Sequence, residues 1–443
     1  MQRTSKPNLA TIAGGDGVYL IDKQGNRYLD ACGGAAVSCL GHSNQRVKQA
    51  IIDQVNEIPY AHTSFFTNNA QEQLAKHLLS HAYGEFSQVY FLTGGSEAIE
   101  ASLKLARQYF FEQGKTEKKL FIARKQSYHG NTLGALAIGG NLWRRKPFDS
   151  ILVEGHHISA CNEYRDKQES ETVFEYGQRI ANELETKILE LGVENVAAFV
   201  AETVGGATAG CLTSPAGYFK RIREICDQYD VLLILDEIMC GMGRTGSLHA
   251  CEQESIQGDL QTIAKGVSAG YQPLGAVLIS EKIVNAIDNG SGFFQHGHTY
   301  IGHPSSCAAG LATQLEIQER DLLSNVKKQG ANLKQSLNES FNADPILADH
   351  VGDIRGRGLF IGIELVADKN SKKAFDPSLK LHAKIKKKAM ENRLMIYPMG
   401  GTVDGVNGDH ILLAPPFIID ENNVAQITER LSSTIRTVLQ EIL

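Results

Sequence analysis

The region from residue 231 to residue 266 constrains the fold more strongly than any other part of the chain. It opens with residues 231–235, an apolar run of branched side chains that is typical of a strand buried in a parallel sheet. Asp236 follows directly, and a second short apolar run, residues 262–264, leads into Lys265. The two polar residues are about one βαβ unit apart. We therefore expect a carboxylate and an amine together at the carboxyl-end edge of an α/β sheet, where such sheets bind ligands.

This pair of side chains suits the chemistry of pyridoxal phosphate. The amine of Lys265 can form a Schiff base with the aldehyde of that cofactor, and the carboxylate of Asp236 can pair with its pyridinium nitrogen. Each residue also has an ordinary alternative. An Asp-Glu pair at a strand end often only caps a helix or faces solvent, and a single lysine is usually a surface charge. The cofactor interpretation therefore depends on what the rest of the chain supplies.

The composition is that of a globular protein. The chain has 443 residues, enough for more than one domain, with 42% hydrophobic and 21% charged side chains. Its net charge of −6 gives no reason to expect nucleic acid as a partner, and no apolar run approaches membrane-spanning length. Residues 1–20 are polar, unlike a secretory signal, and the 8 cysteines are scattered without a Cys-x-x-Cys pair. We therefore expect a cytoplasmic protein with reduced thiols.

Strands and helices alternate through the middle of the chain. Strands are expected at residues 88–92, 119–123, 195–201, 231–235, 262–264 and 274–280, and helices after residue 97 and at residues 216–229. This alternation predicts an α/β fold with a mostly parallel, doubly wound sheet. Each candidate site residue follows the carboxyl end of a strand, so one ligand could contact several of them.

The two ends of the chain predict a smaller α+β domain. Before the sheet region we expect a hairpin at residues 18–30 and helices at 47–56 and 69–81. The aromatic side chains at 60–66 could line a pocket, although core packing is the expected role. After the sheet region we expect a helix at 305–319, a strand at 357–365 and helices around 381–389 and 424–442. The predicted domains are an N-terminal segment of the small domain at 1–61, a large cofactor-binding domain at 62–315 and a C-terminal small domain at 316–443.

Residues 93–97 predict a phosphate site. They join the strand at 88–92 to an amphipathic helix, and they include Gly95 and Ser96. Free backbone N–H groups at a helix N-terminus point at an anion, glycine permits close approach, and the Ser96 hydroxyl adds a donor. Ser96 could equally be the N-cap of the helix, and the two roles are compatible.

Two further strand ends carry candidate residues. Tyr128 follows the strand at 119–123 and could stack on a flat heteroaromatic ring, although a packed loop aromatic is the alternative. Glu202 ends the strand at 195–201, before a glycine-rich segment at 205–210. His296 and His298 could share a strand face, but no third ligand stands at a usable spacing, so we expect no metal site.

With these residues located, the chain resembles the class III (ω-type) aminotransferases, which are fold-type I pyridoxal phosphate enzymes. The resemblance covers nearly the whole length, through residues 33–42, 93–98, 128–130, 201–202, 235–237, 243–246, 265–266, 298–299, 358–359 and 363–364. It implies that Lys265 is the Schiff-base lysine and Asp236 the pyridinium partner. Thr203 is a mild departure from the family, in which proline is common at this position.

The resemblance extends to the other residues around the cofactor. Tyr128 and Ile238 would pack on opposite faces of the ring, Gly95 and Ser96 would hold the phosphate, and Glu202 would lie close to the cofactor. Thr299 would reach the phosphate of the neighbouring subunit, which implies a homodimer with shared active sites.

The implied activity is transfer of an amino group from an amine or ω-amino acid to a keto acid or aldehyde such as pyruvate. The alternatives are a racemase or aminomutase of the same class, or a catalytically silent cofactor-binding module; the lysine argues against the latter. Residues 241–246 also match G-x-G-x-x-G, but they are separated from the strand and start no amphipathic helix, unlike a dinucleotide site.

The loop at residues 399–409 bears on substrate choice. Many ω-type relatives carry an arginine there that binds a substrate carboxylate, and this chain has Gly405 in its place, with Asp404 and Asp409 nearby and no lysine or arginine. A buried carboxylate without a cationic partner is costly. We therefore expect donors without a carboxylate near the reacting carbon; a keto acid would need another arginine, with Arg144 and Arg393 as unranked candidates.

Overall fold

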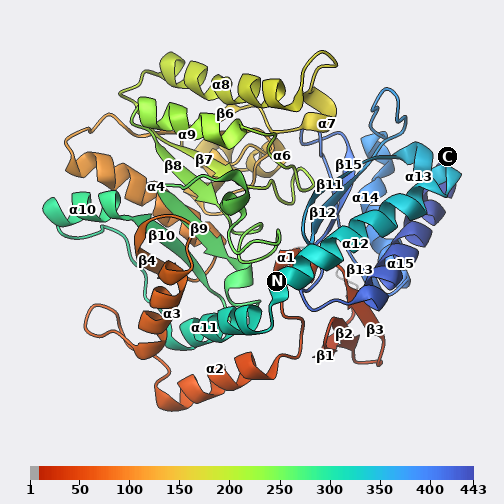
Figure 1. Cartoon of the computed structure of the whole chain (residues 1–443), viewed down its shortest axis with the longest axis horizontal. Coiled ribbons are helices and arrows are strands. Elements are labelled where there is room, and N and C mark those ends of the chain that lie inside the picture. The colour runs from red at the N-terminus through yellow and green to blue at the C-terminus, as the bar shows by residue number, and fades with distance from the viewer. Residues whose placement is uncertain (1–8) are drawn as a thin grey trace.

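The computed structural model describes residues 9–443, and in that part of the chain the largest sheet has seven strands (Figure 1). Strand β10 pairs antiparallel with β4 and β9, and the other neighbouring strands pair in parallel. The predicted α/β fold with a mostly parallel sheet is confirmed, and each strand expected in this region is present. The strand order is β4 (Phe86–Leu92), β10 (Gly275–Ser280), β9 (Leu260–Ala264), β8 (Leu232–Asp236), β7 (Val196–Glu202), β5 (Leu120–Arg124) and β6 (His156–Ile158).

Helices cover both faces of this sheet because its central strands are apolar on both sides. In β8, Leu232 and Ile234 belong to a core that includes α4 (Gly95–Glu112). Leu233 and Leu235 belong to a second core, with α8 (Val173–Leu191) and α9 (Tyr218–Gln228). Successive side chains of a strand point to opposite faces, so one uninterrupted apolar run contributes to two cores.

Two four-stranded sheets lie beside the large one, and one of them combines strands from both ends of the described chain (Figure 1). Strand β13 (Leu394–Met395) pairs in parallel with β3, so the C-terminal part completes a sheet begun at the N-terminus. The predicted hairpin is β2 and β3. The first sheet contains β1 (Ile12–Asp16), β2 (Tyr19–Asp22), β3 (Arg27–Asp30) and β13; the second has the order β11 (Val351–Arg357), β12 (Phe360–Leu365), β15 (Asp409–Leu413) and β14 (Tyr397–Gly400).

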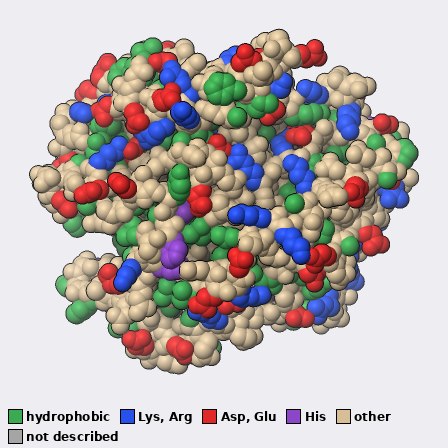
Figure 2. Space-filling view, in the orientation of Figure 1, with side chains coloured by type: hydrophobic (Ala, Val, Ile, Leu, Met, Phe, Trp, Pro, Cys, Tyr) green, Lys and Arg blue, Asp and Glu red, His purple; other side chains and the backbone are tan. Residues whose placement is uncertain are grey.

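Most of the longer helices follow an apolar periodicity in the sequence. Helices α2 (Gln45–Glu57) and α3 (Asn69–Ser80) pack against α11 (Pro304–Glu319), and all three were predicted. Among residues 9–443 no helix is both long and apolar enough to cross a bilayer. Acidic and basic side chains are interspersed over the face in Figure 2. The other helices are α1 (Gly33–Ala36), α5 (Leu133–Ile138), α6 (Leu142–Arg145), α7 (Glu163–Asp166), α10 (Glu281–Asn289), α12 (Leu322–Asn342), α13 (Pro345–His350), α14 (Leu381–Glu391) and α15 (Glu421–Gln440).

Two local predictions were wrong. The strand expected at 357–365 is the end of one strand and the whole of the next: β11 ends at Arg357, and β12 begins at Phe360. Gly358 between them has φ +55°, the left-handed conformation of a turn. The prediction missed this turn because the sequence is apolar on the side of β12 and gives no break in the pattern. The aromatic segment 60–66 does not pack in a core either, since Phe65 and Phe66 are 78% and 69% exposed.

Candidate active site

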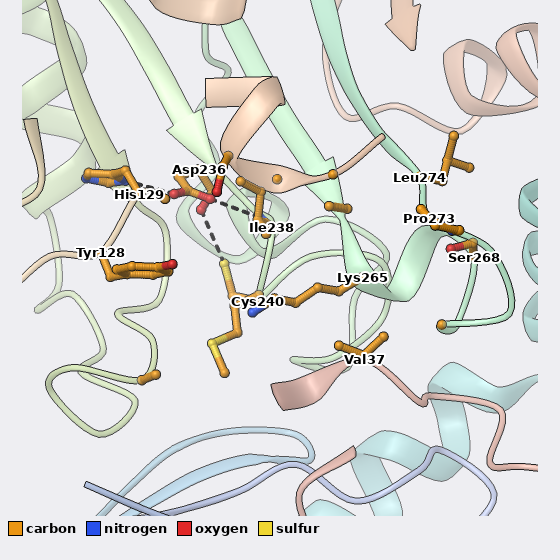
Figure 3. Close-up of a pocket in the computed structure, with 18 of the residues that line it drawn as sticks. Val37, Tyr128, His129, Asp236, Ile238, Cys240, Lys265, Ser268, Pro273 and Leu274 are labelled. Carbon is orange, nitrogen blue, oxygen red and sulfur yellow. Dashed lines mark hydrogen bonds and ion pairs between the residues drawn. The ribbon is translucent and has the colours of Figure 1, made fainter. Parts of the chain in front are cut away.

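A cavity of about 380 Å³ lies at the carboxyl-end edge of the seven-stranded sheet (Figure 3). Its wall is built from chain segments that leave five strands, β4, β5, β7, β8 and β9. Because parallel strands end at one edge, these segments converge although they are far apart in sequence. Seven of the eight predicted site residues line this cavity: Gly95, Ser96, Tyr128, Glu202, Asp236, Ile238 and Lys265.

The eighth predicted residue, Thr299, lies outside the cavity of this chain. It is exposed, in the segment between α10 and α11, and its carbonyl accepts a hydrogen bond of 3.0 Å from the Tyr60 hydroxyl. Phe293 and Tyr300 in the same segment are 64% and 57% exposed. The exposed aromatic side chains of 60–66 and 293–300 are characteristic of an interaction surface.

Asp236 is buried at the end of β8, and both of its carboxylate oxygens accept hydrogen bonds (Figure 3). One accepts the backbone N–H of Ile238 at 3.0 Å, and the other accepts Nδ1–H of His129 at 2.8 Å. Nε2 of His129 is buried and has no hydrogen-bond partner among residues 9–443. Sequence reasoning did not single out His129, although its place beside Tyr128 at a strand end was a usable signal.

The adjacent acid, Glu237, has a structural role. Its carboxylate accepts the N–H groups of Ala250 and Cys251, at 2.8 and 2.7 Å, and the hydroxyl of Thr203 at 3.0 Å. Burial raises the pKa of Glu237 to about 7 despite these hydrogen bonds. Thr203 therefore supplies a hydroxyl donor that a proline at this position would lack. The two adjacent acids at this strand end have separate roles.

Lys265 follows β9 and projects into the cavity (Figure 3). Its φ of +50° is a left-handed conformation that is unusual outside glycine, which is a sign of a constrained functional position. Its amine has no hydrogen-bond partner in the described part of the chain. Burial lowers the pKa of Lys265 to about 8, although Asp236 and Glu202 oppose this shift. The amine is thus far more nucleophilic near neutral pH than that of an ordinary lysine.

The N-terminus of α4 forms an open donor site. Its N-cap is Gly94, without a side-chain hydrogen bond, so the backbone N–H groups of the first turn are not capped. Because the N-cap is Gly94, Ser96 does not cap the helix, and its hydroxyl accepts the N–H of Asn131 at 3.1 Å. A Cβ on Gly95 would lie 2.8 Å from Cγ2 of Ile238, so only glycine lets the helix end approach this side chain.

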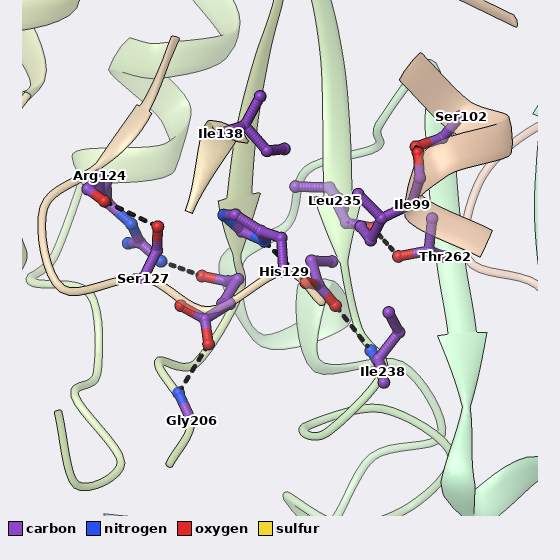
Figure 4. A network of polar contacts seen from close by, with 12 residues as sticks. Ile99, Ser102, Arg124, Ser127, His129, Ile138, Gly206, Leu235, Ile238 and Thr262 are labelled. Atoms are coloured by element: carbon purple, nitrogen blue, oxygen red, sulfur yellow. Dashed lines mark hydrogen bonds and ion pairs between the residues drawn. The ribbon is translucent and has the colours of Figure 1, made fainter. Parts of the chain in front are cut away.

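Glu202 is the second carboxylate in the cavity wall. Its carboxylate accepts the N–H of Gly206 at 2.9 Å, and burial raises its pKa, with the nearby Asp236 adding to the shift. Arg124 donates to its backbone carbonyl rather than to its carboxylate (Figure 4). No arginine belongs to the cavity wall among the described residues.

The acidic residues expected near the substrate lie elsewhere. Asp404 accepts hydrogen bonds from Asn407 and the N–H of Val406 within its own loop, and Asp409 accepts two from His382. Neither lines the cavity. Of the two candidate arginines, Arg393 stacks on Tyr28, which does not line the cavity, whereas Arg144 lies over Tyr128, which does.

Known proteins resemble this chain over nearly its whole length. The family model described as aminotransferase class-III matches residues 1–435. An uncharacterised aminotransferase of Schizosaccharomyces pombe is 44% identical over 430 residues, which cover 97% of this chain and 93% of that protein. A chloroplastic gamma aminobutyrate transaminase 3 of Solanum lycopersicum is 35% identical over 418 residues, covering 93% and 78%. The crystal structure of the omega transaminase from Pseudomonas jessenii in complex with PMP superposes with a TM-score of 0.92 at 31% identity, covering 100% of this chain and 97% of that one.

Proposed function

Since this chain belongs to the class III aminotransferase family, whose members transfer amino groups with pyridoxal phosphate, we propose that it moves an amino group from an amine or ω-amino acid to a keto acid or aldehyde such as pyruvate. The observation that carries the donor assignment is the charge of the cavity wall. It contains the carboxylates of Asp236 and Glu202 and, among the described residues, no arginine. A carboxylate beside the reacting carbon would face these acids without a partner. By the same argument, an aldehyde acceptor fits the cavity better than pyruvate.

The residues of the cavity fit pyridoxal phosphate. Lys265 offers a primary amine, which a Schiff base with an aldehyde requires. This amine has no hydrogen-bond partner among residues 9–443, so it is available to react. Asp236 offers a carboxylate at a fixed position, and the open N-terminus of α4 offers N–H donors for a phosphate. We propose that Gly95 and Ser96 hold the phosphate, and that Tyr128 and Ile238 contact opposite faces of the ring.

The protein residues then divide the proton chemistry. When bound, the cofactor ring supplies a sink for the electron pair left at the substrate carbon after proton loss. We propose that Asp236 keeps the ring nitrogen protonated and that His129 fixes the orientation of this carboxylate through its 2.8 Å hydrogen bond. Lys265, with its pKa lowered to about 8, takes the proton from the substrate carbon as general base and returns a proton as general acid.

We propose that the protein is a homodimer with shared active sites. Thr299 lies outside the cavity of its own chain and within an exposed aromatic surface formed by 60–66 and 293–300. A second copy covering this surface would bury Phe65, Phe66 and Tyr300, and could bring Thr299 to the phosphate bound by its partner. Burial of large aromatic side chains supplies much of the stability of such interfaces.

We also propose the domain division 1–61, 62–315 and 316–443 and a cytoplasmic location. The large sheet lies wholly between Phe86 and Ser280. One smaller sheet combines strands from both ends of the chain and the other is entirely C-terminal, which supports the division. Residues 1–8 of the first segment lie outside the described residues. All eight cysteines are free and buried, which supports a reducing compartment.

Two isomeric donors test the donor assignment. 4-Aminobutanoate carries its carboxylate far from the reacting carbon, and 2-aminobutanoate carries it on that carbon. We expect 4-aminobutanoate to react with a kcat/KM at least about tenfold higher, equivalent to about 1.4 kcal/mol of transition-state binding. The measurement is the donor half-reaction, followed by the absorbance of the bound cofactor. A preference for 2-aminobutanoate would show that the proposed donor class is wrong.

A further inference from the structure

We propose that Arg144 binds the carboxylate at the far end of an ω-amino acid donor. This assignment rests on the proposed function and adds to it the residue that recognises the donor. Three observations support it: α6 is held beside the cavity, the Arg144 guanidinium has no anionic partner among residues 9–443, and the cavity wall is acidic.

Helix α6, which carries Arg144, is fixed beside the cavity by hydrogen bonds. Its N-cap, Asn141, accepts the N–H of Arg144 at 3.3 Å and donates to the side-chain oxygen of Gln126 at 3.1 Å. Gln126 in turn donates to the carbonyl of Gly401 at 2.9 Å. Gln126 is two residues before Tyr128, so α6, the segment that carries Tyr128 and the loop at 401–408 are joined into one structure.

The guanidinium of Arg144 has no anionic partner. Its central carbon lies 4.6 Å from the centre of the Tyr128 ring, and its side chain makes no hydrogen bond or ion pair within residues 9–443. Its Nε is buried and unpaired. The neighbouring Arg145 differs in having partners for its guanidinium. It donates to the carbonyl of Gly139, and its Nε lies 3.8 Å from Oδ1 of Asp149.

Stacking on Tyr128 prepares this guanidinium to bind a carboxylate. An arginine that lies on an aromatic ring uses the face of its planar group, and its N–H groups remain free in the plane. Two of these N–H groups match the two oxygens of a carboxylate. Because the ring already orders the side chain, less conformational entropy is lost when the carboxylate binds.

The position of Arg144 selects a distant carboxylate. Arg144 does not line the cavity itself but lies over the ring of Tyr128, which does. Leu142 and Trp143 on the same helix are 64% and 63% exposed, so α6 is at the surface. A donor whose amine reacts at Lys265 would therefore reach Arg144 only with a group several bonds from the reacting carbon. The acidic cavity wall disfavours a carboxylate at any nearer position.

The test compares two donors of equal chain length in four proteins. 4-Aminobutanoate carries the distant carboxylate, and butylamine lacks it; the proteins are the wild type, Arg144→Gln, Arg144→Lys and the matched control Arg145→Gln. We expect Arg144→Gln to lower kcat/KM for 4-aminobutanoate at least about tenfold, mainly through KM, and to change butylamine less than about twofold. Arg144→Lys should recover only part of the loss, and Arg145→Gln should behave like the wild type.

A second measurement is independent of turnover. Butanoate, which has the carboxylate but no amine, should bind the wild-type holoenzyme in calorimetry and bind Arg144→Gln at least about fivefold more weakly. Unchanged use of 4-aminobutanoate by Arg144→Gln, an equal loss for both donors, or a change of sedimentation in this variant would each overturn the proposal. Failure of the proposed donor class would appear separately, as a preference of the wild type for 2-aminobutanoate.

Discussion

Lys265 is a residue whose chemistry depends on its surroundings more than on its type. Burial in the cavity wall removes part of the hydration of its ammonium, and this lowers its pKa to about 8 from a usual value of 10.5. A lowered pKa means that the folded protein releases this proton more readily. The neutral, nucleophilic amine therefore predominates above pH 8 instead of above pH 10.5.

This shift predicts the pH dependence of labelling at Lys265. In cofactor-free protein, an amine-directed reagent such as trinitrobenzenesulfonate reacts only with the neutral amine. We expect its rate at Lys265 to rise with pH and to reach half its maximum near pH 8. Peptide mass spectrometry measures the rate, with exposed Lys48 as the internal reference. A midpoint near 10.5 would contradict the effect of burial.

Asp236 and Glu237 are adjacent acids, and we expect substitution of Asp236 to affect the reaction rate and substitution of Glu237 to affect stability. Asp236→Asn removes the charge that would hold the cofactor nitrogen protonated, so we expect proton removal from the donor to slow by about 10²–10³-fold while the cofactor stays bound. Single-turnover absorbance measures this step.

The matched control for this variant is Glu237→Gln. The carboxylate of Glu237 accepts three hydrogen bonds outside the cavity wall, so its loss should lower the melting temperature and leave the single-turnover rate of the folded protein nearly unchanged. A normal rate in Asp236→Asn, or equal slowing in both variants, would place the nitrogen partner elsewhere.

In the proposed phosphate site, the position of helix α4 determines where the backbone N–H donors lie. Its N-terminus carries no side-chain cap, and its first residue, Gly95, lies against Ile238 from the end of β8. Strand β8 therefore supplies both Asp236 and the side chain that limits how α4 approaches the cavity. A change at this contact should affect cofactor binding before it affects the fold.

Gly95→Ala tests this contact. The added Cβ would lie 2.8 Å from Cγ2 of Ile238, so the side chain of Ile238 or the end of α4 must shift. We expect the affinity for pyridoxal phosphate to fall about tenfold, with a change in melting temperature no larger than that of an exposed substitution. Equilibrium dialysis and thermal unfolding measure the two effects.

The pair of contacting residues also provides its own control. Ile238→Ala removes Cγ2, the atom that the new Cβ would meet, and should restore much of the affinity in the double variant, because the two changes compensate. Gly14→Ala, where no atom lies within 4 Å of the new Cβ, should leave the affinity unchanged. Additive losses in the double variant would show that the contact does not control binding.

The whole-molecule arrangement predicts complementation between two inactive subunits. If each site uses Lys265 of one chain and Thr299 of the other, a heterodimer of Lys265→Ala and Thr299→Asp subunits contains one site with both changes and one site with neither. Refolding an equal mixture should therefore restore about a quarter of the wild-type activity by random pairing. Each variant alone should be inactive, Thr299→Asp because its charge repels the phosphate.

Sedimentation provides the accompanying control for complementation. The wild type should sediment as a dimer or larger at working concentration, and both variants should retain that state. No recovery in a mixture shown to contain heterodimers would place Thr299 at the site of its own chain. An active monomer would rule out shared sites altogether.

The local elements of this fold were predictable from the sequence because they depend on short-range patterns. Apolar runs predicted the sheet strands, and 3.6-residue periodicity predicted α2, α3 and α15 within a few residues of their ends. The same patterns placed Asp236 and Lys265 directly after two apolar strands in the sequence. Once strands are parallel, their carboxyl ends must share an edge, so a common cavity followed from order along the chain.

Only the tertiary structure decided which groups meet across long sequence distances. The hydrogen bond from His129 to Asp236 joins residues 107 positions apart, and the stacking of Arg144 on Tyr128 depends on how α6 is held by Gln126. The sequence likewise grouped Asp236 with Glu237, and packing separated their roles. Periodicity reports the face on which a side chain lies, whereas its partner, its hydration and therefore its pKa depend on what the rest of the fold brings beside it.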